Sequence, residues 1–336
     1  MVKGAAVRAV SVYLPEKVLD NAELVRQFGT WTESKIFNKT GIRERHVVEE
    51  ELVSDLATGA GEKLFAEHGI DRDGIDFVLL CTECPDYFLP ATACVVQDRL
   101  KLRKNIGALD YNLGCSGFIY GLALAKGLIL SGTANRVLLL TADTITRTIN
   151  PSDKSTRTIF GDAAAAILVE AADAPGIGEF SLGTDGSGAQ KLIIPAGAWA
   201  KPSSPETRVE TSNRWGNVRT LENLYMDGPE ILDFTLDVAP KCMQEIFERN
   251  GTSLEKIKLV VLHQASFMLL EKLRERLGVP DEKFVIDIER YGNTVSCTIP
   301  VALRDAELEG RLVKGDDVLI MGFGVGLSWG GTILRW

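Results

Sequence analysis

Cys115 stands between Gly114 and Gly117, where an apolar strand pattern gives way to a long apolar helix pattern. A thiol at the start of a helix lies close to free backbone N–H groups and a partial positive charge, which stabilise a thiolate. The glycines allow a sharp turn and a close approach of substrate. Two interpretations are open at this point: a nucleophile and a buried core cysteine.

Two later side chains could assist such a nucleophile. His263 follows the buried strand pattern KLVVL, and Asn293 follows the pattern KFVIDI. Groups at the carboxyl ends of strands often carry function in α/β folds. Each residue is equally typical of a structural role, the histidine as a hydrogen-bonded strand end and the asparagine as a helix cap.

A glycine-rich turn, MGFGVGLSWGG, lies between the last two strand patterns. It matches neither a dinucleotide fingerprint nor a phosphate-binding loop. Its exposed backbone N–H groups fit either an oxyanion hole or a simple hairpin. Taken with Cys115, His263 and Asn293, it completes a set of nucleophile, polar partners and oxyanion donors.

The other cysteines do not indicate a metal site. Cys81 and Cys84 form a C-x-x-C motif, but no second pair exists and the three histidines are scattered. A zinc site needs about four ligands, so we expect no metal. We interpret the motif as two small residues at a strand end, with a thioredoxin-like redox pair as the alternative.

Composition excludes several classes of protein. The 336 residues suit two domains or one large duplicated one, with 45% hydrophobic and 25% charged residues. A net charge of −9 without a run of Lys or Arg argues against binding to nucleic acid or an anionic membrane. The N-terminus resembles a first strand more than an export signal, and no apolar run has membrane length. We therefore expect a cytoplasmic protein with reduced cysteines.

Strand and helix patterns alternate along the chain. Strands are expected over 4–15, 75–83, 106–113, 136–143, 162–172, 257–265, 283–288, 317–324 and 327–336. Helices are expected over 20–29, 52–70, 90–102, 117–130, 228–251, 267–278 and 295–310. Pro240 is expected to kink or interrupt its helix, and 172–220 to form excursions and a hairpin.

This alternation predicts an α/β fold with a mainly parallel or mixed sheet covered on both faces. A strand, a reactive loop and a buried helix occur in that order near 109–131 and again near 285–310. The repetition hints at an internal duplication of two α/β halves.

Eight ordered blocks carry a resemblance to a known family. They are KTGIRERH (39–46), LPATACVVQDRL (89–100), GCSGFIYGL (114–122), FGDAAAAIL (160–168), YMDG (225–228), LHQA (262–265), YGNTVS (291–296) and GFGVGLSWG (322–330). In these blocks the chain resembles the β-ketoacyl-[acyl-carrier-protein] synthase III family of thiolase-fold condensing enzymes. The resemblance implies a five-layered α/β/α/β/α homodimer, with the cysteine in a half over 1–172 and the histidine and asparagine in a half over 173–336.

The resemblance also implies a reaction and a Cys–His–Asn triad, matched by Cys115, His263 and Asn293. The thiolate would take an acyl group from acyl-CoA or an acyl-carrier protein. Decarboxylation of a malonyl-carrier protein would then give an enolate that attacks the acyl-enzyme, as in fatty acid biosynthesis. Backbone N–H groups of Cys115 and Val325 would hold the acyl oxyanion, and no cofactor beyond the CoA or phosphopantetheine carrier is implied.

The chain departs from the family pattern at positions that are expected to contact the substrates. Lys35 and Lys154 stand where a Trp and an Arg usually sandwich the adenine of CoA, and lysine is a poor planar stacking partner. Ser266 replaces an expected Asn, Met268 a basic residue linked to carrier docking, and Leu89 a Phe at the floor of the partner's acyl pocket. Substrate contacts are therefore expected at Lys39, Leu89, Lys154, Leu232, Ala265 and Ser266. These changes indicate a divergent member, in a specialised acyl or natural-product pathway, with a donor that is CoA-bound or carrier-bound.

Two alternatives accompany this hypothesis. The first is an acyltransferase that moves the acyl group from Cys115 to an alcohol or amine, against which the presence of Asn293 argues because decarboxylation most needs it. The second is a non-catalytic partner subunit, which would be expected to lack the nucleophile that this chain retains.

Overall fold

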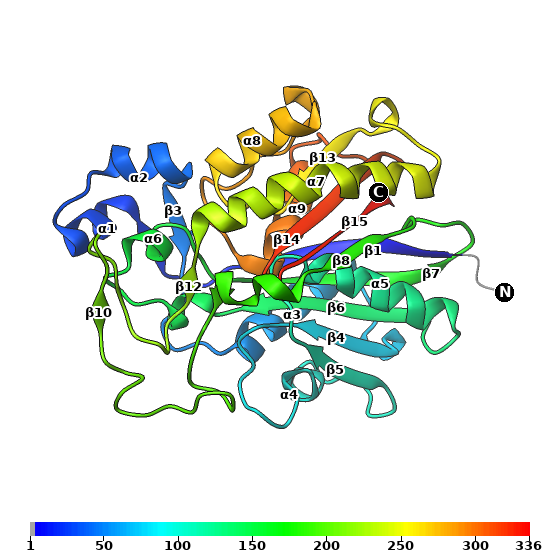
Figure 1. Cartoon of the computed structure of the whole chain (residues 1–336). Coiled ribbons are helices and arrows are strands. Elements are labelled where there is room, and N and C mark those ends of the chain that lie inside the picture. The colour runs from blue at the N-terminus through cyan, green and yellow to red at the C-terminus, as the bar shows by residue number, and fades with distance from the viewer. Residues whose placement is uncertain (1–3) are drawn as a thin grey trace.

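The computed structural model describes residues 4–336 as five layers, two sheets and three layers of helices (Figure 1). The first sheet has the order β1-β7-β6-β4-β5. Its strands are β1 (Gly4–Tyr13), β4 (Phe77–Cys81), β5 (Gly107–Tyr111), β6 (Arg136–Asp143) and β7 (Ala163–Ala172). Strand β4 is parallel to β5 and β6, whereas β7 is antiparallel to β1 and β6.

The second sheet has four strands in the order β13-β14-β15-β8. They are β13 (Leu259–Leu262), β14 (Asp317–Gly324), β15 (Ser328–Arg335) and β8 (Ser181–Thr184). Strand β13 is parallel to β14, and β15 pairs antiparallel with both β14 and β8. The carboxyl ends of β13 and β14 therefore meet at one edge, where His263 and the glycine-rich turn follow.

Two helices form the central layer, α5 (Gly117–Leu130) and α9 (Thr298–Leu308). Their buried side chains share one core with strands of both sheets. A helix covered on both sides must be apolar nearly all round, as α5 is. Gly121 lets α5 approach the first sheet, because a Cβ there would meet the Tyr111 hydroxyl and Leu139.

The outer layers cover the remaining faces of the two sheets. Helices α3 (Val53–His68) and α4 (Thr92–Arg99) pack on the first sheet. Helices α7 (Gly228–Asn250) and α8 (Phe267–Leu277) pack on the second sheet and lie across the molecule from α4 (Figure 1). The arrangement confirms the predicted five-layered thiolase-like α/β fold. The division at 172/173 stays a prediction.

Shorter elements gather beside the active-site end of the sheets. They are β2 (Val18–Asp20), α1 (Asn21–Phe28), α2 (Glu33–Thr40), β3 (Glu44–His46), α6 (Lys154–Arg157), β9 (Leu192–Ile193), β10 (Thr211–Ser212), β11 (Val218–Arg219) and β12 (Tyr225–Met226). Asp20 caps α1, since its side chain accepts from the Glu23 N–H at 2.7 Å. The buried Arg45 guanidinium ties this region together by donating to the carbonyls of Leu19 and Thr158.

Three expectations from the sequence were wrong. Helix α7 is not interrupted at Pro240, because Ala239 and Cys242 bury its inner face against the outer core, whereas a kink there stays a prediction. The predicted strand over 283–288 reduces to a single bridge between Val260 and Phe284. Residues 181–184, expected in an excursion, form edge strand β8 of the second sheet.

No helix among residues 4–336 is both long and apolar enough to cross a membrane.

Candidate active site

Cys115 lies in the loop between β5 and α5, two residues before the first residue of α5. The end of β14 packs against it, since a Cβ on Gly324 would lie 2.8 Å from the Cys115 Cβ and 3.1 Å from its Sγ. A Cβ on Gly322 would lie 2.6 Å from the Cys115 carbonyl oxygen. The glycines of the predicted turn are therefore required by the close approach of two backbones at the nucleophile.

The surroundings of Cys115 are apolar, and the residue is only 7% exposed. The buried and partly buried residues that pack with it include Ile145, Ile149, Phe160, Leu192, Leu224, Val295 and Val325. Burial, together with the charges of Glu83 and Asp143, raises the pKa of the Cys115 thiol well above its usual range. The cysteine is thus a neutral thiol in the unliganded chain, whereas the helix-start argument alone favoured a thiolate.

His263 follows β13, and its backbone N–H donates to the Met321 carbonyl of β14 at 2.9 Å. Its Nδ1 lies 2.7 Å from the Thr298 hydroxyl oxygen. Burial lowers the pKa of His263 to about 3, so the imidazole is neutral near pH 7. The single proton of the Thr298 hydroxyl has two acceptors within reach, His263 Nδ1 at 2.7 Å and the Val295 carbonyl at 3.3 Å. In the tautomer in which Thr298 donates to the nearer Nδ1, the proton of the neutral ring is on Nε2, which has no partner among residues 4–336.

Asn293 is held in place through its backbone and its carbonyl oxygen. Its N–H donates to the Ile159 carbonyl at 2.9 Å, and its Oδ1 accepts from the Val295 N–H at 2.9 Å. The Nδ2 group has no acceptor in the part of the chain that the structure describes. The carboxamide is therefore oriented with its N–H donors free.

The segment 293–298 brings the three predicted residues together. Val295 packs in the same apolar cluster as Cys115. The Ser296 Cβ lies 3.6 Å from the position of a Cβ on Gly117, at the start of α5. Thr298, the first residue of α9, contacts the His263 ring. One turn thus carries Asn293 and contacts both the nucleophile helix and the histidine.

Two backbone donors are free beside the thiol. Within residues 4–336, neither the Cys115 N–H nor the Val325 N–H has a hydrogen-bond acceptor. Val325 directly follows Gly324, which contacts Cys115, and its carbonyl accepts from the Ser328 hydroxyl at 2.7 Å. The geometry is compatible with an oxyanion hole made by these two N–H groups.

Several predicted substrate contacts lie outside this cluster. Lys35 and Lys39 are on α2, and their ammonium groups lie 4.8 and 5.1 Å from the Trp31 ring centroid. Lys154 is the first residue of α6. Leu89 is 82% exposed and contributes nothing to the site of its own chain.

The remaining predicted contacts are on or beside the outer helices. Ser266 caps α8, where its hydroxyl oxygen accepts from the Leu269 N–H at 3.3 Å. Leu232 and Ala265 pack against the outer core of the second sheet, not the cluster around Cys115. Ile231, which the sequence did not single out, packs against that cluster instead.

Sequence reasoning also missed two carboxyl groups and a hydroxyl group. Thr298 orients His263, and Glu83 and Asp143 lie close enough to raise the pKa of Cys115. Glu83 directly follows a buried strand pattern, as His263 does, and that signal was available in the sequence.

Neither the other cysteines nor the carboxylates form a metal site in the described residues. All six cysteines are free, and residues 4–336 contain no group of three or more His, Cys, Asp or Glu side chains suited to a metal ion. Cys81 donates to the Leu113 carbonyl at 2.9 Å, which agrees with the structural interpretation of the C-x-x-C motif.

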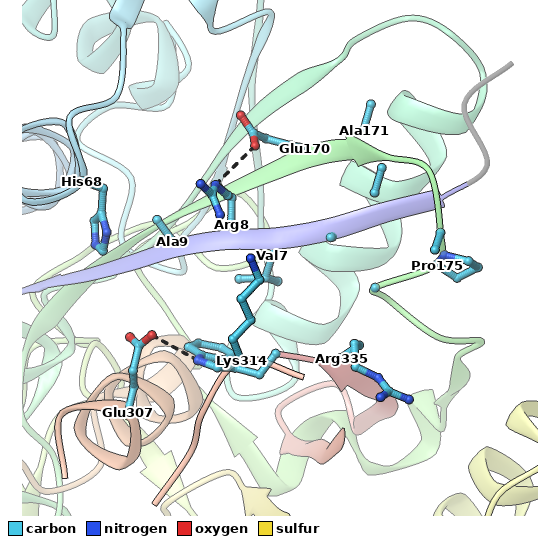
Figure 2. Close-up of a pocket in the computed structure, with 15 residues that line it drawn as sticks. Val7, Arg8, Ala9, His68, Glu170, Ala171, Pro175, Glu307, Lys314 and Arg335 are labelled. Atoms are coloured by element: carbon cyan, nitrogen blue, oxygen red, sulfur yellow. Dashed lines mark hydrogen bonds and ion pairs between the residues drawn. The ribbon is translucent and has the colours of Figure 1, made fainter. Parts of the chain in front are cut away.

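A cavity of about 720 Å³ lies elsewhere, between β1, the end of β7 and the C-terminal residues (Figure 2). Arg8 pairs with Glu170 across it at 3.9 Å, and the Trp336 ring donates to Glu307. Because Glu170 is opposite Arg136, the first residue of β6, this cavity is at the amino end of the parallel strands. Cys115 follows the carboxyl end of β5, so the cavity is remote from the candidate active site.

The five layers, with a cysteine at the start of a central helix, define the class of thiolase-fold condensing enzymes. Two family models match, 3-oxoacyl-[acyl-carrier-protein] synthase III over residues 109–186 and its C-terminal counterpart over 247–336. The chain belongs to this family.

Relatives and solved structures agree over the full length. The β-ketoacyl-[acyl-carrier-protein] synthase III of Caldanaerobacter subterraneus is 35% identical, covering 99% of this chain and 98% of the relative. That of Solibacter usitatus is 36% identical over the same shares. A 3-oxoacyl-(acyl-carrier-protein) synthase III structure, 45% identical, aligns with a TM-score of 0.97 over 99% of this chain and 100% of the other. The Thermus thermophilus enzyme, 36% identical, aligns with a TM-score of 0.88 over 98% and 99%.

Proposed function

We propose that this protein is a β-ketoacyl-[acyl-carrier-protein] synthase III-type condensing enzyme, an acyltransferase with Cys115 as its nucleophile. The observation that carries the proposal is a set of hydrogen-bond donors without acceptors on the segments that pack around Cys115. The free N–H groups of Cys115 and Val325 adjoin the thiol, and the segment 293–298 links it to His263 Nε2 and Asn293 Nδ2.

The first half-reaction is transfer of an acyl group. The Cys115 sulfur attacks the thioester carbonyl, the new Sγ–C bond forms, and the C–S bond to the carrier breaks. The thiol proton of Cys115 ends on the departing carrier thiol. Backbone donors at Cys115 and Val325 stabilise the tetrahedral oxyanion, and the start of α5 stabilises the attacking sulfur as it loses its proton.

The second half-reaction is decarboxylative condensation. A malonyl thioester loses CO2, and the electron pair of the broken C–C bond passes into an enolate. Hydrogen bonds from His263 Nε2 and Asn293 Nδ2 stabilise the enolate oxygen. A neutral imidazole suits this role, because it offers a donor without having to lose a charge. The enolate carbon then attacks the acyl-Cys115 carbonyl and forms the new C–C bond. The C–Sγ bond breaks, the β-ketoacyl thioester is released, and the Cys115 thiolate takes up a proton from solvent.

The substrates are acyl-CoA or an acyl-carrier protein and a malonyl-carrier protein, and no separate cofactor takes part. Lys35, Lys39 and Lys154 supply cations on α2 and α6 that can pair with carrier phosphates. The departures from the family pattern at Lys35, Ser266 and Met268 support a divergent family member with a specialised acyl donor. We place the reaction in the cytoplasm, which the six free cysteines support.

A homodimer accounts for an exposed apolar patch made of Tyr87, Phe88, Leu89 and Trp199. These side chains are 57–85% exposed, and the Phe88 and Trp199 rings lie 5.9 Å apart. Exposed apolar patches mark interaction sites. In a dimer through this patch, Leu89 reaches the acyl group held by the partner subunit.

Intact-mass analysis tests the proposal. The purified chain is incubated with acyl-CoA and acyl-carrier panels, and then with malonyl-carrier protein while CO2 release is measured. We expect an acyl adduct that is absent in Cys115→Ala, followed by a ketoacyl product. No CO2 release and no ketoacyl product, despite an adduct, would instead indicate acyl transfer without condensation.

A further inference from the structure

Glu83 places a carboxyl group next to the candidate nucleophile. Its backbone N–H donates to Asp143 Oδ1 at 2.7 Å, which anchors the residue just after β4. A Cβ on Gly114 would lie 2.5 Å from Glu83 Oε2 and 2.9 Å from Val325 Cγ1. The carboxyl group therefore lies over Gly114, next to Cys115 in sequence, and beside the turn that supplies Val325.

The Glu83 side chain is partly buried, and its carboxyl group has no protein partner among residues 4–336. No donor, and no cation, among residues 4–336 hydrogen-bonds or pairs with either of its oxygens. The neighbouring Asp143 is different, because it accepts from the Glu83 N–H and from the hydroxyl groups of Thr82 and Ser296, at 3.3 and 2.8 Å. Asp143 is thus satisfied by the fold, whereas Glu83 retains its full hydrogen-bonding capacity.

Apart from the proposed donors His263 and Asn293, the side chains that pack with Cys115 are apolar and include Ile145, Phe160, Leu192, Leu224 and Val325. Burial and the charge of Asp143 raise the pKa of Glu83 to about 8, and burial raises that of Asp143 to about 7. Near neutral pH the pair holds a proton, and Glu83 is the more strongly protonated member. Glu83 is then a neutral acid with an O–H donor.

We propose that Glu83 is a specificity-determining residue that hydrogen-bonds a hydroxyl or keto oxygen on the acyl chain carried by Cys115. The inference rests on the proposed function, because it concerns the acyl group of that same thioester. A simple alkyl chain leaves the carboxyl group unpaired against an apolar surface, whereas an oxygen substituent satisfies it. Sites that bind a substrate hydroxyl discriminate strongly against the analogue that lacks it.

The test compares acylation of Cys115 by butyryl-CoA, 3-hydroxybutyryl-CoA and 4-hydroxybutyryl-CoA, with kcat/KM measured by intact mass. Wild type is expected to favour one hydroxyacyl donor by about tenfold. Glu83→Gln keeps a neutral donor and retains most of this preference. Glu83→Met, which replaces the carboxyl group by an apolar group of similar length, loses it and accepts butyryl-CoA more readily.

The outcomes separate this inference from the proposed function. If wild type is acylated by all three donors without preference, Glu83 does not select an oxygen and the inference fails while the proposed function stands. An unchanged preference in Glu83→Met also overturns it. No adduct on Cys115 with any donor contradicts the proposed function itself. Should Glu83→Met not fold, the wild-type panel and Glu83→Gln still decide.

Discussion

Substitution of Asn293 can separate acylation from condensation in the proposed reaction, because replacing its Nδ2 by oxygen changes one heavy atom. Its Oδ1 accepts from the Val295 N–H at 2.9 Å and so holds the turn, whereas its Nδ2 has no acceptor in residues 4–336. Asn293→Asp keeps an oxygen at the first position and removes the donor at the second. Asn293→Ala removes both.

The expected magnitude follows from this division. Loss of one donor to a developing oxyanion costs about 2.7–4 kcal/mol, or about 10²–10³ in rate. The aspartate variant adds like-charge repulsion with the enolate, so its condensation rate falls by at least that factor. The alanine variant also loses the side-chain oxygen that accepts from the Val295 N–H, which costs about 1 kcal/mol of stability.

The assay follows both half-reactions in the same preparation. Acyl-Cys115 formation is measured by intact mass, and decarboxylation by CO2 release from malonyl-carrier protein. Acylation should persist in both variants while CO2 release collapses, and only Asn293→Ala should unfold at a lower temperature. Equal losses in acylation and condensation would refute the assignment of Nδ2 to the enolate.

Two further perturbations test the geometry around the thiol and the histidine. Gly324→Ala places a methyl group 2.8 Å from the Cys115 Cβ, so we expect about 1–3 kcal/mol of destabilisation and loss of acylation. The matched control is Gly127→Ala, at a solvent-exposed position of α5 where a Cβ would meet nothing within 4 Å. It should stabilise the protein by about 1 kcal/mol and leave acylation intact. Similar behaviour of the two variants would argue against a tight approach at Cys115. His263 has a pKa lowered to about 3, below its unfolded value, so its contribution to stability is fully present above about pH 6.5 and is lost as pH falls toward 3. Denaturant unfolding at pH 7.5 and pH 5 should show a smaller loss in His263→Gln than in wild type, and an equal loss would mean that the ring is solvated.

Much of the layered fold could be predicted because its strands and helices are buried on particular faces. The apolar pattern of α5 indicated a buried helix, and the structure places it between the two sheets. The pattern KFVIDI was equally apolar, yet only Phe284 pairs with a strand. An apolar run records burial, and burial does not by itself decide whether a neighbouring strand is present to accept the backbone hydrogen bonds.

The candidate site was partly visible for a related reason. Cys115, His263 and Asn293 each follow an apolar run, and the ends of parallel strands share one edge. Glu83 likewise follows β4, but the sequence did not single it out, because its significance depends on the residues that contact its side chain. Only the contact with Gly114, and the absence of a partner in residues 4–336, distinguish it from a surface acid.

The sequence alone indicated the candidate nucleophile, its two candidate partners, the glycine-rich turn and the layered architecture, because residue type and hydrophobic period are local properties. Tertiary structure decided the chemical state of these groups. Burial makes Cys115 a neutral thiol and His263 a neutral ring, and the turn at 293–298 leaves the Asn293 amide free. A pKa and a free donor depend on the atoms that surround a group, and those atoms come from segments far apart in the chain.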